Sequence, residues 1–436
     1  MSVADDIIEK VDRKEQDTQR LRDRWASDYV THWLLEDYKG MDKGYKVYTS
    51  NESRNYARKT VTGLSGAAMV VQVPQDKDDR SNRDEDNAKE RFILGSMKAN
   101  DERLALIGEP TLRQWMSFTL PNFGYTMGRC LLIKEKGRSW ADATPWDPKE
   151  VTWEYGHKGL IWICHKYFAL RSQVEGQWGI AKEGTKGWEA VAVYDYYDEE
   201  RNIVVIPSAK DTPVKNERHG LIDQVPGWVA TSSLQPPITR ERVVGSEQAG
   251  VQLADSIADY GESIYAENRS VWETHNFNMS ILKELAHRSL KPVFGIRSQS
   301  GVVVVEGDPF AAGKEIPLRD GQELIVYDFI RAAGDMGPFM TAAMQEMQRG
   351  GYPVIMYGDA PVAISGYAMN TLRSGVADKI VPLAQAKSTA LRQIANIWCD
   401  HFVAGGFGAL ELNGQGRNRR WFSSTITPDM LRDLPE

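Results

Sequence analysis

The chain has 436 residues, of which 42% are apolar and 26% charged, values close to those of ordinary soluble globular proteins. This composition excludes a disordered tail, a collagen-like chain and a coiled-coil fibre, and the length allows two or three domains or one elongated subunit. The formal net charge of −7 and the isoelectric point near 5.7 argue against a protein built for tight nucleic-acid binding, which needs clustered Lys and Arg.

The chain carries no signal for a membrane or a secretory pathway. Apolar runs such as residues 301–305 are far shorter than the roughly 20 residues of a membrane-spanning helix. The charged first 16 residues lack the apolar core of a signal peptide, which predicts a protein made and retained in a cytoplasm. We therefore expect neither a membrane span nor secretion.

Cysteine and histidine spacing gives no metal or disulfide motif. The three cysteines, Cys130, Cys164 and Cys399, are too widely spaced to form a CxxC pair or a disulfide framework. His157, Cys164 and His165 lie in a strand-like pattern without a fourth ligand nearby, so we expect no zinc site.

The N-terminal half begins with helices and continues as a β region. Apolar residues at helical spacing predict a helix over residues 7–38, and residues 73–91 form a charged loop that leads into a helix ending near Leu106. A further helix is expected after Pro110. Alternating apolar residues, separated by Gly, Lys and Asp-rich turns, predict antiparallel strands over residues 128–207.

A long helix and a small β insert come next. Residues 241–272 contain no proline and have apolar positions at helical spacing, which predicts one long helix, with an extension through residues 280–290 left open. Gly250 and Gly261 weaken this helix but permit the close approach of a neighbour. Strands are expected near residues 302–305 and 323–327, followed by a helix over 337–349.

The C-terminal part begins with a loop rich in Gly and Pro over residues 350–366, followed by a long amphipathic helix. Pro382 lies inside that helix and predicts a kink. Residues from Val403 onward are Gly-rich and then basic, which predicts a small terminal element and a short tail. The order of helices and antiparallel strands predicts an α+β fold.

The sequence contains no catalytic or nucleotide-binding motif with the required residues and spacing. The nearest candidate for a phosphate-binding loop, GDPFAAGKE, puts five residues between Gly307 and Gly313 instead of four, and Glu315 stands where Ser or Thr should bind magnesium. GxSxG and HExxH are absent. Adjacent acids such as Asp198 and Glu199 are typical of solvated loops. We expect no enzyme, no cofactor and no metal site.

The order of elements resembles that of the portal proteins of tailed double-stranded DNA bacteriophages. Two segments carry the resemblance most clearly: VVGSEQAGVQLADSIADYGESIYAENRSVW, similar to the long helix of the family, and YGDAPVAISGYAMNTLRSGVADKIVPLAQAKSTALRQIA, similar to its loop and kinked helix. The likeness extends over nearly the whole chain. The apparent crown is short, which departs from family members with a long helical barrel.

The resemblance implies a division of the chain. It gives a wing over residues 1–237, a stem helix over 238–278, a clip over 279–333, a second stem helix over 334–350, a tunnel loop over 351–365, a kinked wing helix over 366–402, and a short crown or C-terminal tail over 403–436. Gly250 and Gly261 would allow stem helices to pack side by side around a pore.

The resemblance also implies a function. The chain would be a non-enzymatic subunit of a ring, expected to be a dodecamer, at one vertex of the virion capsid, assembled in the host bacterial cytoplasm. Double-stranded DNA would pass through the channel during packaging and ejection, and a mildly acidic wall would let it slide. The expected protein partners are the terminase large subunit, a head-tail adaptor, and the major capsid or scaffolding protein.

The tunnel loop supplies the residues expected to face DNA, namely Tyr352, Val354, Ile355, Met356, Tyr357 and Asp359. Apolar and aromatic contact would be weak and independent of base sequence. The alternative is that these side chains cap the core beneath the loop. Two other functions stay open, another viral structural component such as a head-tail connector, and a DNA-processing nuclease.

Overall fold

The computed structural model describes most of the chain, in two compact units. The described residues are 2–35, 47–66, 69–73, 87–135, 137–179, 186–207, 213–221, 223–232, 261–289, 294–298, 322–326, 337–352, 366–416 and 419–432, with only the backbone described at 287–289, 294–296, 324, 326 and 366–378. The first unit comprises Met1–Tyr29, Ala57–Ile264 and Ala377–Glu436, and the second comprises Val30–Tyr56 and Tyr265–Val376.

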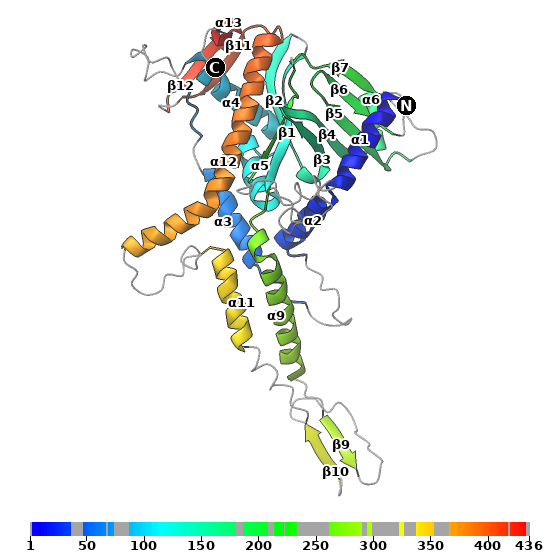
Figure 1. Ribbon diagram of the computed structural model, residues 1–436, viewed down its shortest axis with the longest axis vertical. Helices are drawn as coiled ribbons and strands as arrows, with labels where there is room; N and C mark the ends of the chain where they lie inside the picture. The colour runs from blue at the N-terminus through cyan, green and yellow to red at the C-terminus, as the bar shows by residue number, and fades with distance from the viewer. Residues whose placement is uncertain are drawn as a thin grey trace, which may run out of the picture. The chain divides into compact units, whose positions relative to one another are not determined.

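The described part of the chain is a mixture of helices and antiparallel strands (Figure 1). The helices are α1 (Val3–Asp17), α2 (Gln19–Trp33), α3 (Glu52–Gly66), α4 (Ala88–Leu106), α5 (Leu112–Phe123), α6 (Arg171–Trp178), α9 (Arg269–Ser289), α11 (Gly337–Gly350), α12 (Gly366–Ala404) and α13 (Asp429–Arg432). The strands are β1 (Tyr125–Glu135), β2 (Arg138–Trp146), β3 (Val151–Gly156), β4 (Gly159–Leu170), β5 (Ala190–Tyr197), β6 (Arg201–Val205), β7 (Lys215–Arg218), β8 (Gly227–Thr231), β9 (Phe294–Ser298), β10 (Gln322–Val326), β11 (Leu410–Gln415) and β12 (Trp421–Ile426). None of the described helices is long and apolar enough to cross a membrane.

A three-stranded antiparallel sheet, ordered β2-β1-β8, lies at the centre of the first unit. Because side chains alternate along β1, Cys130 and Leu132 face one core while Tyr125 and Met127 face another. Helices α4, α5 and α12 cover the first of these faces and bury residues such as Trp398 against it. The sheet is therefore covered on both faces.

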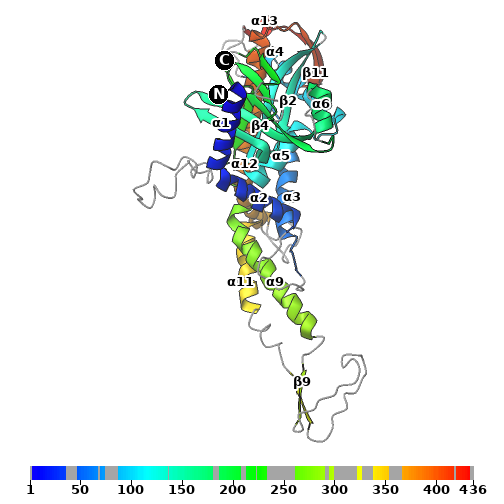
Figure 2. The same ribbon diagram turned by 90° about the vertical axis from the view of Figure 1, so that its right-hand side faces the viewer.

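A five-stranded antiparallel sheet, ordered β3-β4-β5-β6-β7, forms the second layer of this unit. Helix α1 lies against one face of this sheet (Figure 2). Tyr194 and Tyr196 of β5 are buried there in one cluster with Ile7 and Val11 of α1. Val193 points to the opposite face, where it packs against Val174 of α6. The alternation predicted from the sequence thus places helices on opposite faces of one sheet.

Local sequence signals explain where the helices of this unit begin and end. The Asn87 side chain accepts from the Glu90 amide at the start of α4, and Thr111 forms a capping box with Gln114 at the start of α5. α5 ends at Gly124, which adopts a left-handed φ of 73°. The helices predicted to end near Leu106 and to start after Pro110 are confirmed.

The terminal element predicted after Val403 is the hairpin β11-β12 followed by α13. It belongs to the first unit, because Leu410, Leu412 and Leu431 are part of its main core. The strand β11 packs closely on α4, where a Cβ at Gly95 would lie 2.7 Å from the Cβ of Leu412.

Two of the predicted helices differ from the observed ones. The helix predicted over residues 7–38 is interrupted at Thr18, whose hydroxyl donates to the Lys14 carbonyl and ends α1 before α2 begins. The helix predicted over residues 241–272 does not pass through Gly261, and α9 begins only at Arg269 and extends to Ser289. Residues 233–260 and the strand predicted near 302–305 lie outside the described residues.

Candidate functional site

The second unit contains a pair of helices, α9 and α11, packed side by side (Figures 1 and 2). α11 buries Met340, Ala343 and Met347, which follow one another at helical spacing and form one face. The start of α9 meets the end of α11, because the Asn268 Nδ2 donates to the Met347 carbonyl at 2.9 Å. The chain therefore runs out along one helix and returns along the other, with β9 and β10 between them in sequence.

The end of α11 is fixed by a tight backbone arrangement at Gly350 and Gly351. A Cβ at Gly350 would lie 2.1 Å from the Asn268 Oδ1, a distance that real Cβ atoms do not adopt. The Gly351 amide donates to the Met347 carbonyl at 2.9 Å and closes the helix. Asn268 thus occupies the space that a side chain at position 350 would need, and the backbone at Gly350 and Gly351 is held at this point.

Tyr352, the first residue of the predicted DNA-facing set, is buried rather than exposed. Its ring is 4% exposed and packs edge-on against Tyr56, with ring centres 4.6 Å apart. Tyr56 in turn contacts Trp272 of α9. The prediction that Tyr352 faces a duplex is wrong, because its ring belongs to the core of the second unit. Val354, Ile355, Met356, Tyr357 and Asp359 lie outside the described residues.

The inner face of α9 is unusually polar for a buried surface. The Asn276 Oδ1 accepts from the Ser50 amide at 2.9 Å, and the Ser280 Oγ accepts from the Tyr48 amide at 2.8 Å. Burial lowers the pKa of His275, which favours its neutral form. These bonds to the backbone fix which residues of the segment before α3 lie opposite which turn of α9.

Two large apolar side chains of α11 stay exposed on either side of its buried face. Phe339 and Met344 are 53% and 52% exposed, and Glu346 and Arg349 supply the charged groups of this helix. Between α9 and α11, a shallow groove is lined by residues that include Val271, Phe339 and Ala342. An exposed surface with large apolar side chains and few charges is typical of a surface that another chain covers.

Gly261 does not lie in a stem helix. It adopts a φ of 77°, and a Cβ there would lie 2.5 Å from the Tyr125 Cε2 of the same chain. The Gly124 carbonyl oxygen would lie 3.0 Å from the same Cβ, and a Cβ at Gly124 would lie 2.5 Å from the Gly261 carbonyl oxygen, so the two left-handed glycines pack against each other. The prediction that Gly261 packs stem helices is wrong, since its small size serves a contact inside the first unit. Gly250 lies outside the described residues.

Pro382 lies inside α12, as predicted, and that helix is assigned without interruption from Gly366 to Ala404. The proline ring removes one backbone donor from the helix. The kink itself stays a prediction. The boundary between the two units falls near this position, between Val376 and Ala377.

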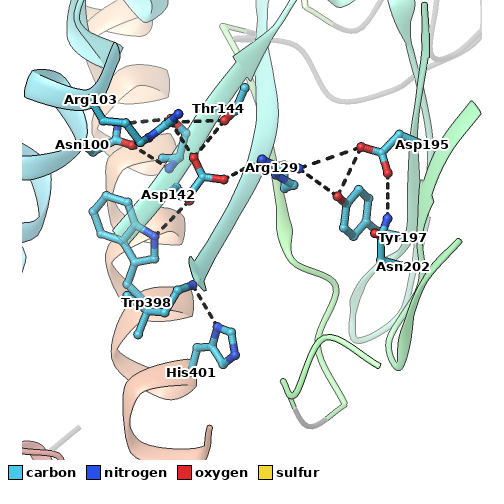
Figure 3. A network of polar contacts seen from close by, with 12 residues as sticks. Asn100, Arg103, Arg129, Asp142, Thr144, Asp195, Tyr197, Asn202, Trp398 and His401 are labelled. Carbon is cyan, nitrogen blue, oxygen red and sulfur yellow. Dashed lines mark hydrogen bonds and ion pairs between the residues drawn. The ribbon is translucent and has the colours of Figure 1, made fainter. Parts of the chain in front are cut away.

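A network of buried charges joins the layers of the first unit (Figure 3). Asp142 on β2 is 1% exposed, and its two oxygens pair with Arg103 of α4 at 2.5 Å and Arg129 of β1 at 2.6 Å. Arg129 also donates to the Tyr197 hydroxyl at 3.1 Å, while Tyr197 donates to Asp195. The network thereby ties α4 and the three-stranded sheet to β5 of the five-stranded sheet.

The electrostatics of this network favour a structural role. Burial alone would lower the pKa of Arg129, but the neighbouring Tyr197, Asp142 and Asp195 outweigh it and raise that pKa. Each Asp142 oxygen is occupied by a guanidinium, so neither is placed to accept a proton from a substrate. Nearby, the buried His401 Nδ1 accepts from the Leu132 amide at 3.0 Å, and burial together with His219 lowers the pKa of His401 to about 4.

Possible metal ligands do not converge in the described residues, where no group of three or more His, Cys, Asp or Glu side chains could hold an ion. Cys164 and His165 are neighbours on β4 and therefore point to opposite faces of the sheet. Cys164 is buried beneath α1, whereas His165 stacks on Trp146. Burial raises the pKa of the Cys164 thiol.

Lys387 is a buried cation that the sequence analysis did not single out. Its ammonium is buried in the first unit and donates to the Leu64 carbonyl and the Ser117 hydroxyl, both at 2.9 Å. A signal was present, because Lys387 falls four residues after Leu383 and four before Leu391 on the predicted apolar stripe of the last long helix. A cation at such a position is expected to be buried.

Comparison with known proteins gives matches among solved structures alone. No family model matches the chain, and neither does any curated protein. A virion of a native gene transfer agent particle is similar at 11% identity and a TM-score of 0.39, covering 79% of this chain and 73% of that chain. The neck of the empty particle, computed with C6 symmetry, is similar at 13% identity and a TM-score of 0.43, covering 86% of this chain and 80% of that chain. The neck of the native particle, computed with C12 symmetry, is similar at 13% identity and a TM-score of 0.35, covering 85% of this chain and 86% of that chain. TM-scores below 0.5 do not establish a common fold.

Proposed function

We propose that this chain is a portal protein, a ring-forming subunit whose copies enclose a channel for double-stranded DNA at one vertex of a viral capsid. The observation that carries the proposal is the helix pair of the second unit. α9 and α11 pack together, bracket β9 and β10 in sequence, and lead directly into a loop rooted at Gly350–Tyr352. The same order of stem helix, clip, stem helix and tunnel loop is expected from the resemblance to portal proteins.

Two exposed apolar side chains of α11 support assembly into a ring. A helix that leaves Phe339 and Met344 half exposed loses the free energy of burying them unless a neighbour covers them, at roughly 25 cal/mol for each Å² of apolar surface. A head-to-tail interface uses two different faces of each copy, and it closes into a ring when the rotation between neighbouring copies is a whole fraction of a turn. The expected ring has twelve subunits.

The assembly proposal is tested by imaging and by mass. The purified full-length chain should form rings with a central hole in negative stain and elute as one high-mass species in light scattering. The double variant Phe339→Glu, Met344→Glu should prevent ring formation, because two charges would be buried in the interface. Leu106→Glu is the matched control, since Leu106 is 87% exposed on the first unit and should leave rings intact. A wild-type chain that stays monomeric would contradict the proposal, as would rings formed equally well by the double variant.

The second part of the proposal concerns the tunnel loop. With Tyr352 serving as the root, the residues proposed to face DNA are Val354, Ile355, Met356, Tyr357 and Asp359. Met356→Asp with Tyr357→Asp should leave rings intact and reduce packaged or retained DNA, because two carboxylates would repel the phosphates. Normal genome content in particles carrying this pair would refute the assignment.

The proposed partners follow from the resemblance, namely the terminase large subunit during packaging, a head-tail adaptor afterwards, and the major capsid or scaffolding protein around the ring. Assembly in a host cytoplasm and residence in the virion are part of the same proposal. A portal needs no turnover of its own, so magnesium-dependent DNA cleavage by the purified protein would favour the nuclease alternative instead.

A further inference from the structure

The first unit contains an open groove of about 700 Å³, and all of its lining residues belong to that unit. Its floor is formed by α12 and α4, and one side is the segment 69–73, which lies outside helices and strands. Val70 of this segment is 69% exposed, so the groove opens to solvent. The Glu90 carboxylate accepts from the Val73 amide at 2.8 Å and holds the segment in place.

The charged side chains of the groove are all cationic. Lys89, Arg113, Lys387 and Arg392 line it, and no Asp or Glu is among the lining residues. Arg113 also interacts with Asp101 nearby, but no ion pair to Lys89, Lys387 or Arg392 occurs within the described part of the chain. The groove is therefore complementary in charge to an anion.

Lys387 makes this complementarity specific. It is 6% exposed, and its two hydrogen bonds go to neutral oxygens, on Leu64 and Ser117, although an ammonium has three donors. Burial and the like charge of Arg113 lower the pKa of Lys387 to about 8. A buried cation without a carboxylate is unfavourable, and an incoming anion would relieve that cost.

The rest of the lining is mainly apolar, with Gln72, Ser388 and Asn396 as its uncharged polar residues. Met69, Val71 and Val73 come from one side and Ile93, Met97 and Leu391 from the floor. The sugar-phosphate backbone of a nucleic acid has no apolar side chains that could pack against these walls. The groove therefore fits a ligand that is both anionic and apolar. An alkyl carboxylate would leave its chain exposed to water in a groove this open, whereas a peptide can turn aliphatic side chains inward and keep its polar backbone outward.

We propose that this groove binds a short segment of a partner protein in which a carboxylate side chain is flanked by aliphatic residues. The carboxylate would reach Lys387 and Arg113, and Arg392, which also lines the groove, would add a third positive charge that attracts it. The aliphatic side chains would contact the walls around Val71 and Leu391. Charge-assisted hydrogen bonds to a desolvated ammonium are stronger than neutral ones. The inference does not depend on the proposed ring function, since all lining residues lie within the first unit.

The test begins with a random heptapeptide library panned against the full-length protein. Retained peptides should be enriched in Asp or Glu next to Leu, Ile or Val. A fluorescently labelled peptide of the most enriched sequence then gives a Kd by anisotropy. Its amide analogue, with Asn or Gln in place of each acid, should bind at least about ten-fold more weakly, because a charge-assisted bond is lost.

Variants of the protein locate the binding. Lys387→Met and Arg392→Glu should each weaken the peptide by about ten-fold or more. Arg392 is exposed, so its variant stays informative even if Lys387→Met unfolds. Arg138→Glu, an equal charge change at an exposed position outside the groove, is the matched control and should bind normally. Equal binding by Arg392→Glu would overturn the proposal. So would a library without acidic enrichment, or a groove that takes sodium decanoate or a 20-nucleotide single-stranded DNA while retaining no peptide.

Discussion

Replacing Gly350 with alanine should loosen the root of the loop that follows α11. A Cβ at this position would lie within 2.6 Å of three atoms of the Asn268 amide group, so that side chain must move away. Its movement breaks the 2.9 Å bond to Met347 and leaves buried polar groups unpaired, at a cost of about 1–3 kcal/mol. Alanine recovers up to about 1 kcal/mol through its better helix propensity. The net expectation is a loss of about 1–2 kcal/mol.

Hydrogen exchange measures this loss locally. Peptides covering residues 337–352 should exchange about 5–30 times faster in Gly350→Ala than in the wild type, while peptides from α4 stay unchanged. The decisive comparison is made in an Asn268→Ala background. There the obstructing amide is absent, so adding Gly350→Ala should be neutral or protective. An equal effect of Gly350→Ala in both backgrounds would show that Asn268 does not hold the loop root.

Three further outcomes test the first unit by urea unfolding. Asp142→Ala should lower the free energy of unfolding by about 3 kcal/mol, because Arg103 and Arg129 lose their shared carboxylate, whereas Glu102→Ala, on an exposed pair with Lys98, should cost less than about 1 kcal/mol. Gly261→Ala should cost clearly more than Gly108→Ala, since both have a left-handed φ but only Gly261 has Tyr125 within 2.5 Å of a Cβ; equal losses would place the cost in the backbone alone. His401 has a folded pKa of about 4, below its ordinary 6.5, so the unfolded chain binds more protons between these values and stability falls as the pH drops from 6.5 to 4. Between pH 7 and pH 5 the loss should be about 2 kcal/mol larger in the wild type than in His401→Asn, and identical pH profiles would contradict this.

Periodicity predicted the elements whose partners are close in the sequence. Alternation along β1 and β4 acts over a few residues, so the helices between 87 and 123 and the antiparallel strands between 125 and 207 could be assigned, whereas α6 (Arg171–Trp178) was not predicted. The helices α11 and α12 followed in the same way from their apolar stripes. Local rules suffice where an element needs only to present one face to a core.

The errors arose where a distant contact decided the conformation. Gly261 follows a run with helical spacing, yet its left-handed φ is fixed by Tyr125 and Gly124, more than 130 positions earlier in the chain. Tyr352 stands in a Gly/Pro-rich stretch typical of an exposed loop, but Tyr56 covers its ring. Neither partner can be identified from spacing, because tertiary contacts override local preference.

The two helices of the second unit make different kinds of contact: α9 forms hydrogen bonds to the segment before α3, and α11 contributes mainly apolar side chains. α9 meets the segment before α3 through hydrogen bonds from backbone amides to Asn276 and Ser280, which specify position because a hydrogen bond needs a defined distance and angle. α11 buries Met340, Ala343 and Met347 and leaves Phe339 and Met344 half exposed on either side of that buried face. Apolar contact is tolerant of small shifts, whereas a buried amide is not. In the proposed ring, the position of each loop root would therefore be set within its own subunit by α9, and the neighbour would add cohesion through α11 without redefining that position.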